Sequence, residues 1–491
     1  MTGAEAIGNA VGIALLSALA VECILRLPFI PLVKAVIGAN RKALRVIGSK
    51  RISDHWKEKV MLAYSGETLK ASLKLAGLIF LVVAVLAVLA TGIDRITGTF
   101  LAFIVSPLGL VASLVIAGIY AKARRFLFKP NTGFRSNYSV LDRLLHRLAL
   151  QLTPVAEMSF DLDQARYGKT RAAGDIASQK HIFVCGLARA GTTILMRRFY
   201  ETGAFRSLTY RDMPFVLAPN LWRSLSGAST KDAVAGERAH GDRLKVDVDS
   251  PESLDEVFWR VFSGDDYIRK DRLVPYDPDG ETLEQYVHYV GAILAQEPAG
   301  TRYLSKDNNN VLRLGVLRKA FPNALILIPF RDPLQQAASL MNQHQRFVEM
   351  QAQDPFVRSY MTWLGHHEFG SDHRPFAFHD GDLERLCAHT PDTLDYWVAE
   401  WIGTYGFLLD TAIDHGAILV CYEDLCTNPA VWTALCALAA LDAPAEPAGA
   451  FENAPRQISA ACDADLEKTA RDLYERLRNR SLEALPNGHL A

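Results

Sequence analysis

The sequence is poor in the features that mark several protein classes. Its 491 residues include seven cysteines, an odd number without a C-x-x-C pair, so the thiols are expected to be reduced and structural, as on a cytosolic face. Lys and Arg number 53 against 54 Asp and Glu, so no global basic field indicates nucleic-acid binding. No basic stretch precedes the first apolar segment, which argues against a cleaved signal peptide.

Charge is also missing from two long runs, Leu75–Ile93 and Ile96–Ala121. Each is long enough to cross a hydrocarbon core of about 30 Å as a helix. Because only Asp94 and Arg95 separate the runs, they predict a tight transmembrane hairpin over residues 71–125, with Pro107 as a kink in its second helix. A pair of buried core helices is the alternative.

Basic residues flank this hairpin on both sides, and by the positive-inside rule both flanks are then cytoplasmic. They are Lys50, Arg51, Lys57, Lys59, Lys70 and Lys74 before it, and Lys122, Arg124, Arg125 and Lys129 after it.

The first 70 residues hold a less regular apolar segment, Ala6–Ile37. Charged residues and two prolines, Pro28 and Pro31, interrupt it, so an interfacial or partly inserted amphipathic helix is favoured over a full span. Residues 126–171 form a connector in which leucines at helical spacing predict an amphipathic helix on the domain that follows. These leucines are Leu141, Leu144, Leu145, Leu148 and Leu150.

A strand, a glycine-bounded loop and a helix start follow one another from His181 to Arg198. Ile182–Cys185 is uniformly apolar, as buried parallel strands are, and the loop runs from Gly186 to Gly191. Backbone N–H groups at such a helix start have no intrahelical partner, so the loop predicts an anion cradle. The glycine spacing matches a nucleotide P-loop, but Thr192 stands where an NTPase needs lysine.

The cation lies inside the loop instead, at Arg189. The run Arg189-Ala190-Gly191-Thr192-Thr193 resembles the 5′-phosphosulfate loop of sulfotransferases that use 3′-phosphoadenosine 5′-phosphosulfate (PAPS). An ordinary strand–helix turn with a solvent-facing arginine is the alternative.

A second stretch, Ala324–Ser339, strengthens this resemblance. A strand is predicted over Leu325–Ile328, and Asp332 and Pro333 are suited to start a helix, which places Arg331 at the strand end and Ser339 about two turns on. An arginine and a hydroxyl so placed can hold one phosphate. They fall on the binding positions of the family's 3′-phosphate motif, and Cys421–Leu425 resembles its late tyrosine–acid–leucine stretch.

Sulfuryl transfer needs alignment and charge stabilisation, so cations near the leaving oxygen should dominate. Arg189 is the first candidate, and Lys306 resembles the family's catalytic lysine. Cytosolic members carry a histidine base two residues later, but here the residue is Asn308, whose amide cannot accept a proton.

The base must therefore come from elsewhere, if one is needed. Since membrane-bound and carbohydrate sulfotransferases often use a carboxylate, Glu252 is the first candidate and Glu256 the second, with His240 as a third. For the two acids, a plain dipole complement at a helix start is the alternative.

Histidine and acidic residues crowd one further stretch without matching a zinc pattern, so no metal site is predicted. An acceptor-binding lid or a solvated loop is expected there. The residues are His366, His367, Glu368, His373, His379 and Asp380.

The sequence thus predicts an α/β enzyme in which helices flank a three-layer, P-loop-like parallel sheet over residues 172–491, behind an N-terminal helical membrane anchor. The resemblance implies a PAPS-dependent sulfotransferase on the cytoplasmic face of a membrane, acting without a metal on a hydroxyl of a membrane-proximal glycan, lipid or other envelope molecule. The alternatives are a P-loop kinase or NTPase and a non-catalytic membrane protein that keeps the fold. Homo-oligomerisation stays open.

Overall fold

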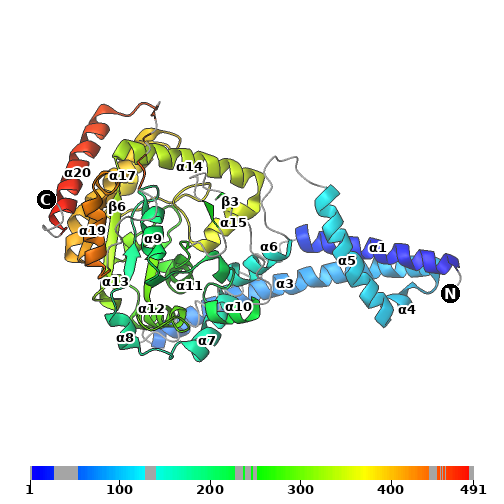
Figure 1. Cartoon of the computed structure of the whole chain (residues 1–491). Coiled ribbons are helices and arrows are strands. Elements are labelled where there is room, and N and C mark those ends of the chain that lie inside the picture. Colours follow the sequence, from blue (N-terminus) through cyan, green and yellow to red (C-terminus); the bar gives the residue numbers. More distant parts are fainter. Residues whose placement is uncertain are drawn as a thin grey trace. The chain divides into compact units, whose positions relative to one another are not determined.

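The structure is a computed structural model of the chain (Figure 1). It describes residues 3–26, 54–127, 140–226, 236–237, 245–246, 251–441, 451–453, 455, 457–458 and 460–485. The chain divides into two compact units, Met1–Thr132 and Gly133–Ala491. The described helices of the first unit are α1 (Gly3–Arg26), α3 (Asp54–Thr97), α4 (Phe100–Ile104) and α5 (Pro107–Leu127).

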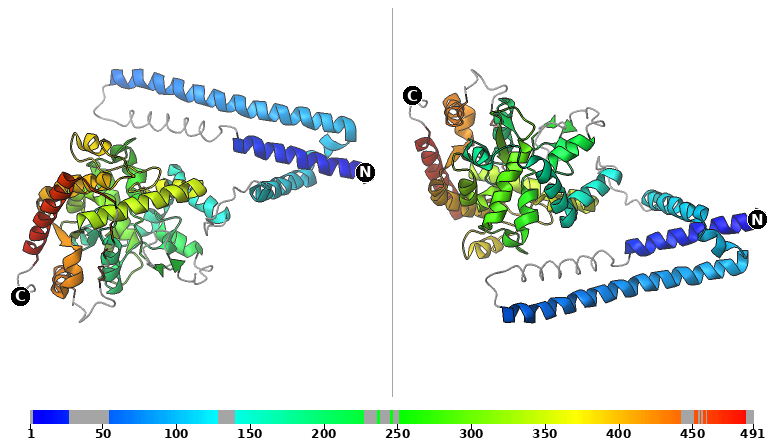
Figure 2. Two further views of the ribbon diagram at one scale, coloured as in Figure 1. Left: turned by 90° about the horizontal axis from the view of Figure 1, so that it is seen from above. Right: turned by 90° about the horizontal axis from the view of Figure 1, so that it is seen from below.

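The first unit is a small helical assembly in which α1 packs against α3, α4 and α5 (Figure 2). Ile13 and Leu16 of α1 share a buried cluster with Ala90 and Phe100. Polar contacts join the same helices, because the Tyr120 hydroxyl donates to Glu22 Oε1 over 3.1 Å and Asn9 donates to the Thr99 hydroxyl over 3.1 Å. The described part of the first apolar segment is therefore a helix that packs on the others. The rest of that segment, residues 27–37, lies outside the described residues.

The chain reversal in this unit differs in detail from the prediction. Helix α3 runs through Asp94 and Arg95 and ends at Thr97, and the reversal starts at Gly98, which adopts a φ of 69° that favours glycine. Asp94 stays close to the turn and accepts a hydrogen bond from the Leu101 N–H over 3.0 Å. Pro107 does not kink one long helix but opens α5, where its missing N–H costs no hydrogen bond.

One stretch of the described helices, Thr68–Arg95, is long and apolar enough to cross a membrane, and 6% of its apolar window is buried. The apolar stretch of α5, Pro107–Tyr120, is shorter. Consecutive side chains of α3 are exposed, including Ile79, Phe80 and Leu81, so apolar residues cover more than one face of this helix.

The second unit holds the sheet and its helices. Before the sheet come α6 (Val140–His146), a π-helix (Arg147–Gln151), α7 (Thr153–Tyr167) and α8 (Ala173–Ser178). The strands are β1 (Ile182–Val184), β2 (Phe205–Arg206), β3 (Gly236–Glu237), β4 (Lys245–Val246), β5 (Arg302–Lys306), β6 (Leu325–Phe330) and β7 (Ala417–Cys421). The helices between and after them are α9 (Thr192–Glu201), α10 (Pro219–Ser226), α11 (Glu256–Tyr267), α12 (Gly280–Ile293), α13 (Leu314–Ala320), α14 (Pro333–Gln353), α15 (Pro355–Leu364), α16 (Asp382–Cys387), α17 (Leu394–Asp414), α18 (Tyr422–Thr427), α19 (Pro429–Leu438) and α20 (Ala464–Glu483), with short 3₁₀ turns at Tyr210–Asp212 and Asn308–Leu312.

Five of these strands form one parallel sheet in the order β2-β5-β1-β6-β7, and β3 pairs with β4 in a separate antiparallel ribbon. Strand β1 is central, with Val184 in register with Lys306 of β5 on one side and Leu327 of β6 on the other. The carboxyl ends of three neighbouring strands therefore meet at one edge, which is where parallel sheets bind ligands.

Helices cover both faces of this sheet, as the alternation along β1 requires. Ile182 and Val184 face a cluster formed with α9 and α19, whereas Phe183 and Cys185 face a larger cluster with α11, α12, α13 and α17. The unit is an α/β fold with a parallel sheet between two helical layers (Figure 1). The predicted α/β class with a parallel sheet is confirmed.

The region predicted as a connector contributes to this larger cluster. Ala149 and Leu150 of the π-helix and Phe160 of α7 are buried in it, whereas Leu144 and Leu148 are exposed. This region therefore packs within the second compact unit, and the predicted domain start at residue 172 stays a prediction.

Candidate functional site

The loop between β1 and α9 has the backbone of an anion cradle. Gly186 (φ 127°) and Gly191 (φ 89°) adopt conformations that favour glycine, and Arg189 between them is also left-handed, with a φ of 69°. Left-handed residues in such a loop turn successive N–H groups toward one point, where they attract an anion. Any Cβ at Gly191 would overlap the ring of Tyr422, the first residue of α18. Glycine is therefore required at this position by packing as well as by φ.

The two predicted halves of the site touch each other. Arg189 Nε donates to the Ser339 hydroxyl over 2.9 Å, joining the β1 loop to the second turn of α14. Gln336, one turn earlier on α14, donates to the carbonyl oxygen of Ala188 over 3.0 Å and accepts from Trp401 over 3.0 Å. This buried glutamine fixes the loop relative to α14 and α17.

Arg331 follows β6, and its side chain lies over the ring of Tyr422 with 5.6 Å from Cζ to the ring centroid. Its guanidinium donates to Asn453 over 3.2 Å and lies 3.7 Å from Glu423. Among the described residues, Arg331 Nε is buried without a hydrogen-bond partner. This Nε faces Glu423 at ion-pair distance but makes no hydrogen bond to it, and a bound phosphate oxygen would accept such a bond, so these residues fit a phosphorylated ligand.

Lys306 ends β5 and is buried, 7% exposed, beside the β1 loop. Its charge helps to lower the pKa of Glu368. His366, next to Glu368, has its pKa raised in part by Glu252 and lowered in part by Lys306. Asn308 donates to Glu368 Oε1 over 2.8 Å. A lysine, an imidazole and carboxylates thus gather at the carboxyl end of β5.

The two carboxylates predicted at the start of α11 lie in different environments. Glu252 is 7% exposed and accepts a hydrogen bond from the Tyr210 hydroxyl over 2.7 Å. Glu256 is fully buried and bonded to Arg313 and to Tyr267. Burial raises the pKa of Glu256, although the Arg313 charge works against that shift. A buried paired acid has a structural role, so we drop Glu256 from the proposed catalytic set.

The sequence analysis did not predict that His366 and Glu368 lie near Lys306 at the end of β5. The solvated-loop alternative is wrong for His367, which is 1% exposed, and for the Glu368 side chain, which is 9% exposed. His379 and Asp380 are exposed. The apolar neighbours Leu364 and Phe369 were the signal that these polar residues turn inward. His240 lies outside the described residues.

No group of three or more His, Cys, Asp or Glu side chains in the described part of the chain is arranged to hold a metal ion. The described cysteines are all free thiols.

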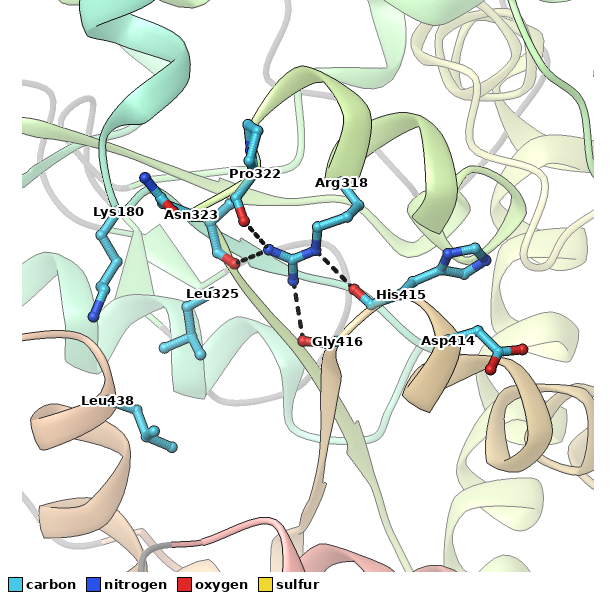
Figure 3. Close-up of a pocket in the computed structure, with 10 residues that line it drawn as sticks. Lys180, Arg318, Pro322, Asn323, Leu325, Asp414, His415, Gly416 and Leu438 are labelled. Carbon is cyan, nitrogen blue, oxygen red and sulfur yellow. Dashed lines mark hydrogen bonds between the residues drawn. The ribbon is translucent and has the colours of Figure 1, made fainter.

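A cavity of about 460 Å³ lies at the opposite edge of the sheet (Figure 3). Its lining includes Lys180 and Gly416, which precede β1 and β7, and Leu325, the first residue of β6. Arg318 points into it, but its guanidinium already donates to the carbonyl oxygens of His415 and Gly416, over 2.8 Å and 3.0 Å, and to those of Pro322 and Ala324. We assign this cavity no part in the site, because it is remote from the carboxyl ends of the strands.

Comparison with known proteins agrees with this geometry. Residues 181–374 match the model of the sulfotransferase family, a range that contains the loop, Lys306, Arg331 and Ser339. No curated protein sequence matches the chain.

The solved structures that are similar to it include three sulfotransferases. Sulfotransferase STF1 from Mycobacterium tuberculosis H37Rv has a TM-score of 0.36 at 16% identity, over 70% of this chain and 87% of that one. Sulfotransferase STF9 from Mycobacterium avium has a TM-score of 0.34 at 14% identity, over 74% of this chain and 81% of that one. A sulfotransferase from Alicyclobacillus acidocaldarius has a TM-score of 0.30 at 14% identity, over 62% of this chain and 95% of that one. These superpositions are loose, so the assignment rests on the family match. Over residues 181–374, this chain is thus similar to the sulfotransferase family.

Proposed function

We propose that the protein is a PAPS-dependent sulfotransferase that acts at a membrane surface. The observation that carries the proposal is the contact between Arg189 and Ser339, which joins the two motifs expected to hold opposite ends of the donor. Arg331, at the end of the adjacent strand, would supply a third phosphate-binding group, whose buried Nε has no hydrogen-bond partner among the described residues.

Each group has a role that follows from its place. The N–H groups of the loop from Gly186 to Thr193, with the guanidinium of Arg189, would bind the 5′-phosphosulfate, because a left-handed loop at a helix start attracts anions. Arg331 and Ser339 would bind the 3′-phosphate. Lys306, buried at the end of β5, would stabilise the charge that grows on the leaving oxygen.

Glu252 was the first candidate for the base, and it lies near this group of residues. Its carboxylate accepts a hydrogen bond from the Tyr210 hydroxyl and helps to raise the pKa of His366. We propose that it orients or binds the acceptor. We propose an acceptor hydroxyl as the nucleophile, presented by a glycan, a lipid or another envelope molecule.

Attachment to a bilayer is supported by α3, whose apolar side chains are exposed on more than one face. Such a helix needs an apolar solvent around it. The basic residues that flank the apolar runs support a cytoplasmic orientation for the second unit.

The test is calorimetry on the full-length protein in detergent micelles, titrated with 3′-phosphoadenosine 5′-phosphate (PAP) in EDTA and with ATP and Mg²⁺. We expect PAP to bind without magnesium, and Arg331→Ala and Arg189→Ala to weaken it. Arg346→Ala, an exposed arginine on the same helix α14, is the matched control and should bind PAP normally.

Tight binding of ATP and Mg²⁺ with indifference to PAP would overturn the proposal and favour a kinase or NTPase. Transfer of ³⁵S from labelled PAPS is then measured with a total membrane lipid extract and with a soluble glycan extract, which separates a lipid acceptor from a glycan acceptor.

A further inference from the structure

The segment that follows α15 brings a histidine to the place where the resembled family keeps its base. Helix α15 ends at Leu364, and the next residue, Gly365, has a φ of 79° that turns the chain back. Asn309 donates to the Gly365 carbonyl oxygen over 3.2 Å. The turn holds His366 and Glu368 against the residues that follow β5.

One oxygen atom links the two elements. Asn308 Nδ2 donates to Glu368 Oε1 over 2.8 Å, and His366 Nδ1 lies 3.3 Å from the same oxygen. The imidazole and the Asn308 amide are therefore neighbours in space, although they are far apart in the sequence. Asn308 occupies the position of the missing histidine, so His366 stands beside that position from a different element.

The charges around the ring favour a proton on it. Burial by itself would lower the pKa of His366, but the carboxylates of Glu368 and Glu252 outweigh burial and the opposing charge of Lys306, so the pKa is raised. Burial would raise the pKa of Glu368, but His366 and Lys306 outweigh it and hold that pKa well below its usual range. Glu368 therefore stays ionised and stabilises the imidazolium.

We propose that His366 is the general base of the transfer and that Glu368 is its positioning residue. This inference rests on the proposed sulfotransferase function. With Nδ1–H directed at Glu368, the lone pair of Nε2 is left for the acceptor. The acceptor O–H bond breaks and its proton moves to Nε2, while the oxygen forms a bond to sulfur. The bond from sulfur to the phosphate oxygen breaks, and its electron pair leaves on PAP beside Lys306.

The His366 side chain is 19% exposed, whereas that of Glu368 is 9% exposed, which fits these two roles. A base needs access to the acceptor, and a residue that orients it does not. Among the described residues, the other oxygen of Glu368, Oε2, has no hydrogen-bond partner. The contacts of the Glu368 carboxylate with Asn308 and His366 are both made by Oε1.

The experiment uses the full-length protein in detergent, with PAP binding measured by calorimetry and transfer from ³⁵S-labelled PAPS to a membrane extract. His366→Asn should bind PAP like the wild type but lose transfer by about 10²- to 10⁴-fold, the range for a general base. His379→Asn, an exposed histidine on the same segment, is the matched control and should keep full activity.

A relocated base provides the second test. In His366→Asn, the added substitution Asn308→His places an imidazole at the family position and should recover at least part of the lost rate. Wild-type activity should rise with pH through a pKa above 6.5, because the base must be neutral. In Glu368→Gln this rise should move to lower pH, a shift that a purely structural residue would not cause.

Two results would overturn the inference while the proposed function stands. In the first, His366→Asn binds PAP and transfers sulfate like the wild type. In the second, Glu252→Gln alters the pH profile of transfer and the His366 and Glu368 variants do not. Failure of the wild type to bind PAP would overturn the proposed function, and His366 would then have no transfer to serve.

Discussion

Arg189 and Ser339 are 150 residues apart in the sequence, yet the arginine donates to the serine hydroxyl over 2.9 Å. The contact joins the loop after β1 to the helix after β6, so two motifs that were separate in the sequence form one site. In the structure, the serine hydroxyl holds the cation of the loop in place.

Ser339→Ala should weaken PAP binding about 10-fold, because one hydrogen bond to a charged group is lost together with the hold on Arg189. Ser359→Ala is the matched control, since the half-buried Ser359 hydroxyl donates to the Pro355 carbonyl oxygen of its own helix α15 over 3.2 Å. Calorimetry on both variants checks the difference. Equal affinities would mean that Ser339 contributes nothing to the nucleotide site.

Gly191→Ala should destabilise the protein and abolish PAP binding, because the added methyl group must displace the Tyr422 ring, on which Arg331 lies. Gly203→Ala separates this clash from backbone strain. Gly203 has a similar φ of 73°, but nothing lies within 4 Å of its missing Cβ. Thermal unfolding and PAP titration compare the two variants. Similar losses of stability and PAP binding in both would mean that backbone strain, and not the clash with Tyr422, causes the effect of Gly191→Ala.

Glu256→Gln should lower the free energy of unfolding by about 3–5 kcal/mol, because it leaves Arg313 buried with a weakened partner. Glu252→Gln changes a carboxylate bonded to Tyr210 and should leave the melting temperature nearly unchanged while altering transfer. Denaturant unfolding and the transfer assay distinguish the two acids. A stable Glu256→Gln variant with lost activity would return Glu256 to the catalytic set.

Glu400→Gln should stabilise the protein at pH 9 and have little effect at pH 5. Burial raises the pKa of Glu400 to about 8, so the folded state holds a proton that the unfolded state has already lost above about pH 4.5. The free energy of unfolding therefore falls as the pH rises from 4.5 to 8, and a neutral amide removes that loss. Thermal unfolding at both pH values provides the measurement, and equal effects at the two would contradict the assignment.

Phe80→Arg should reduce the fraction of the protein that stays in membranes after carbonate extraction. Phe80 is 75% exposed near the middle of Thr68–Arg95, where a charge costs about 3 kcal/mol in a bilayer. Leu144→Arg, at an exposed leucine of the second unit, is the matched control and should not change the fraction. Complete extraction of the wild-type protein by carbonate would argue against a spanning helix.

The features that could be predicted from the sequence are those that depend on residues close together in the chain. The apolar strand, the glycine-bounded loop and the Asp332–Pro333 helix start depend on neighbours within a few residues, so their pattern predicted the parallel α/β fold and the order of its motifs. The apolar run around Phe80 likewise predicted a helix by composition alone.

Which polar residues share a site depends instead on how the chain packs in three dimensions. Glu252 and Glu256 are only four residues apart in the sequence, yet one bonds to Tyr210 and the other is buried against Arg313. His366 and Asn308 meet through a single oxygen of Glu368. Such pairings depend on how distant segments pack against one sheet, and no pattern of neighbouring residues encodes that packing.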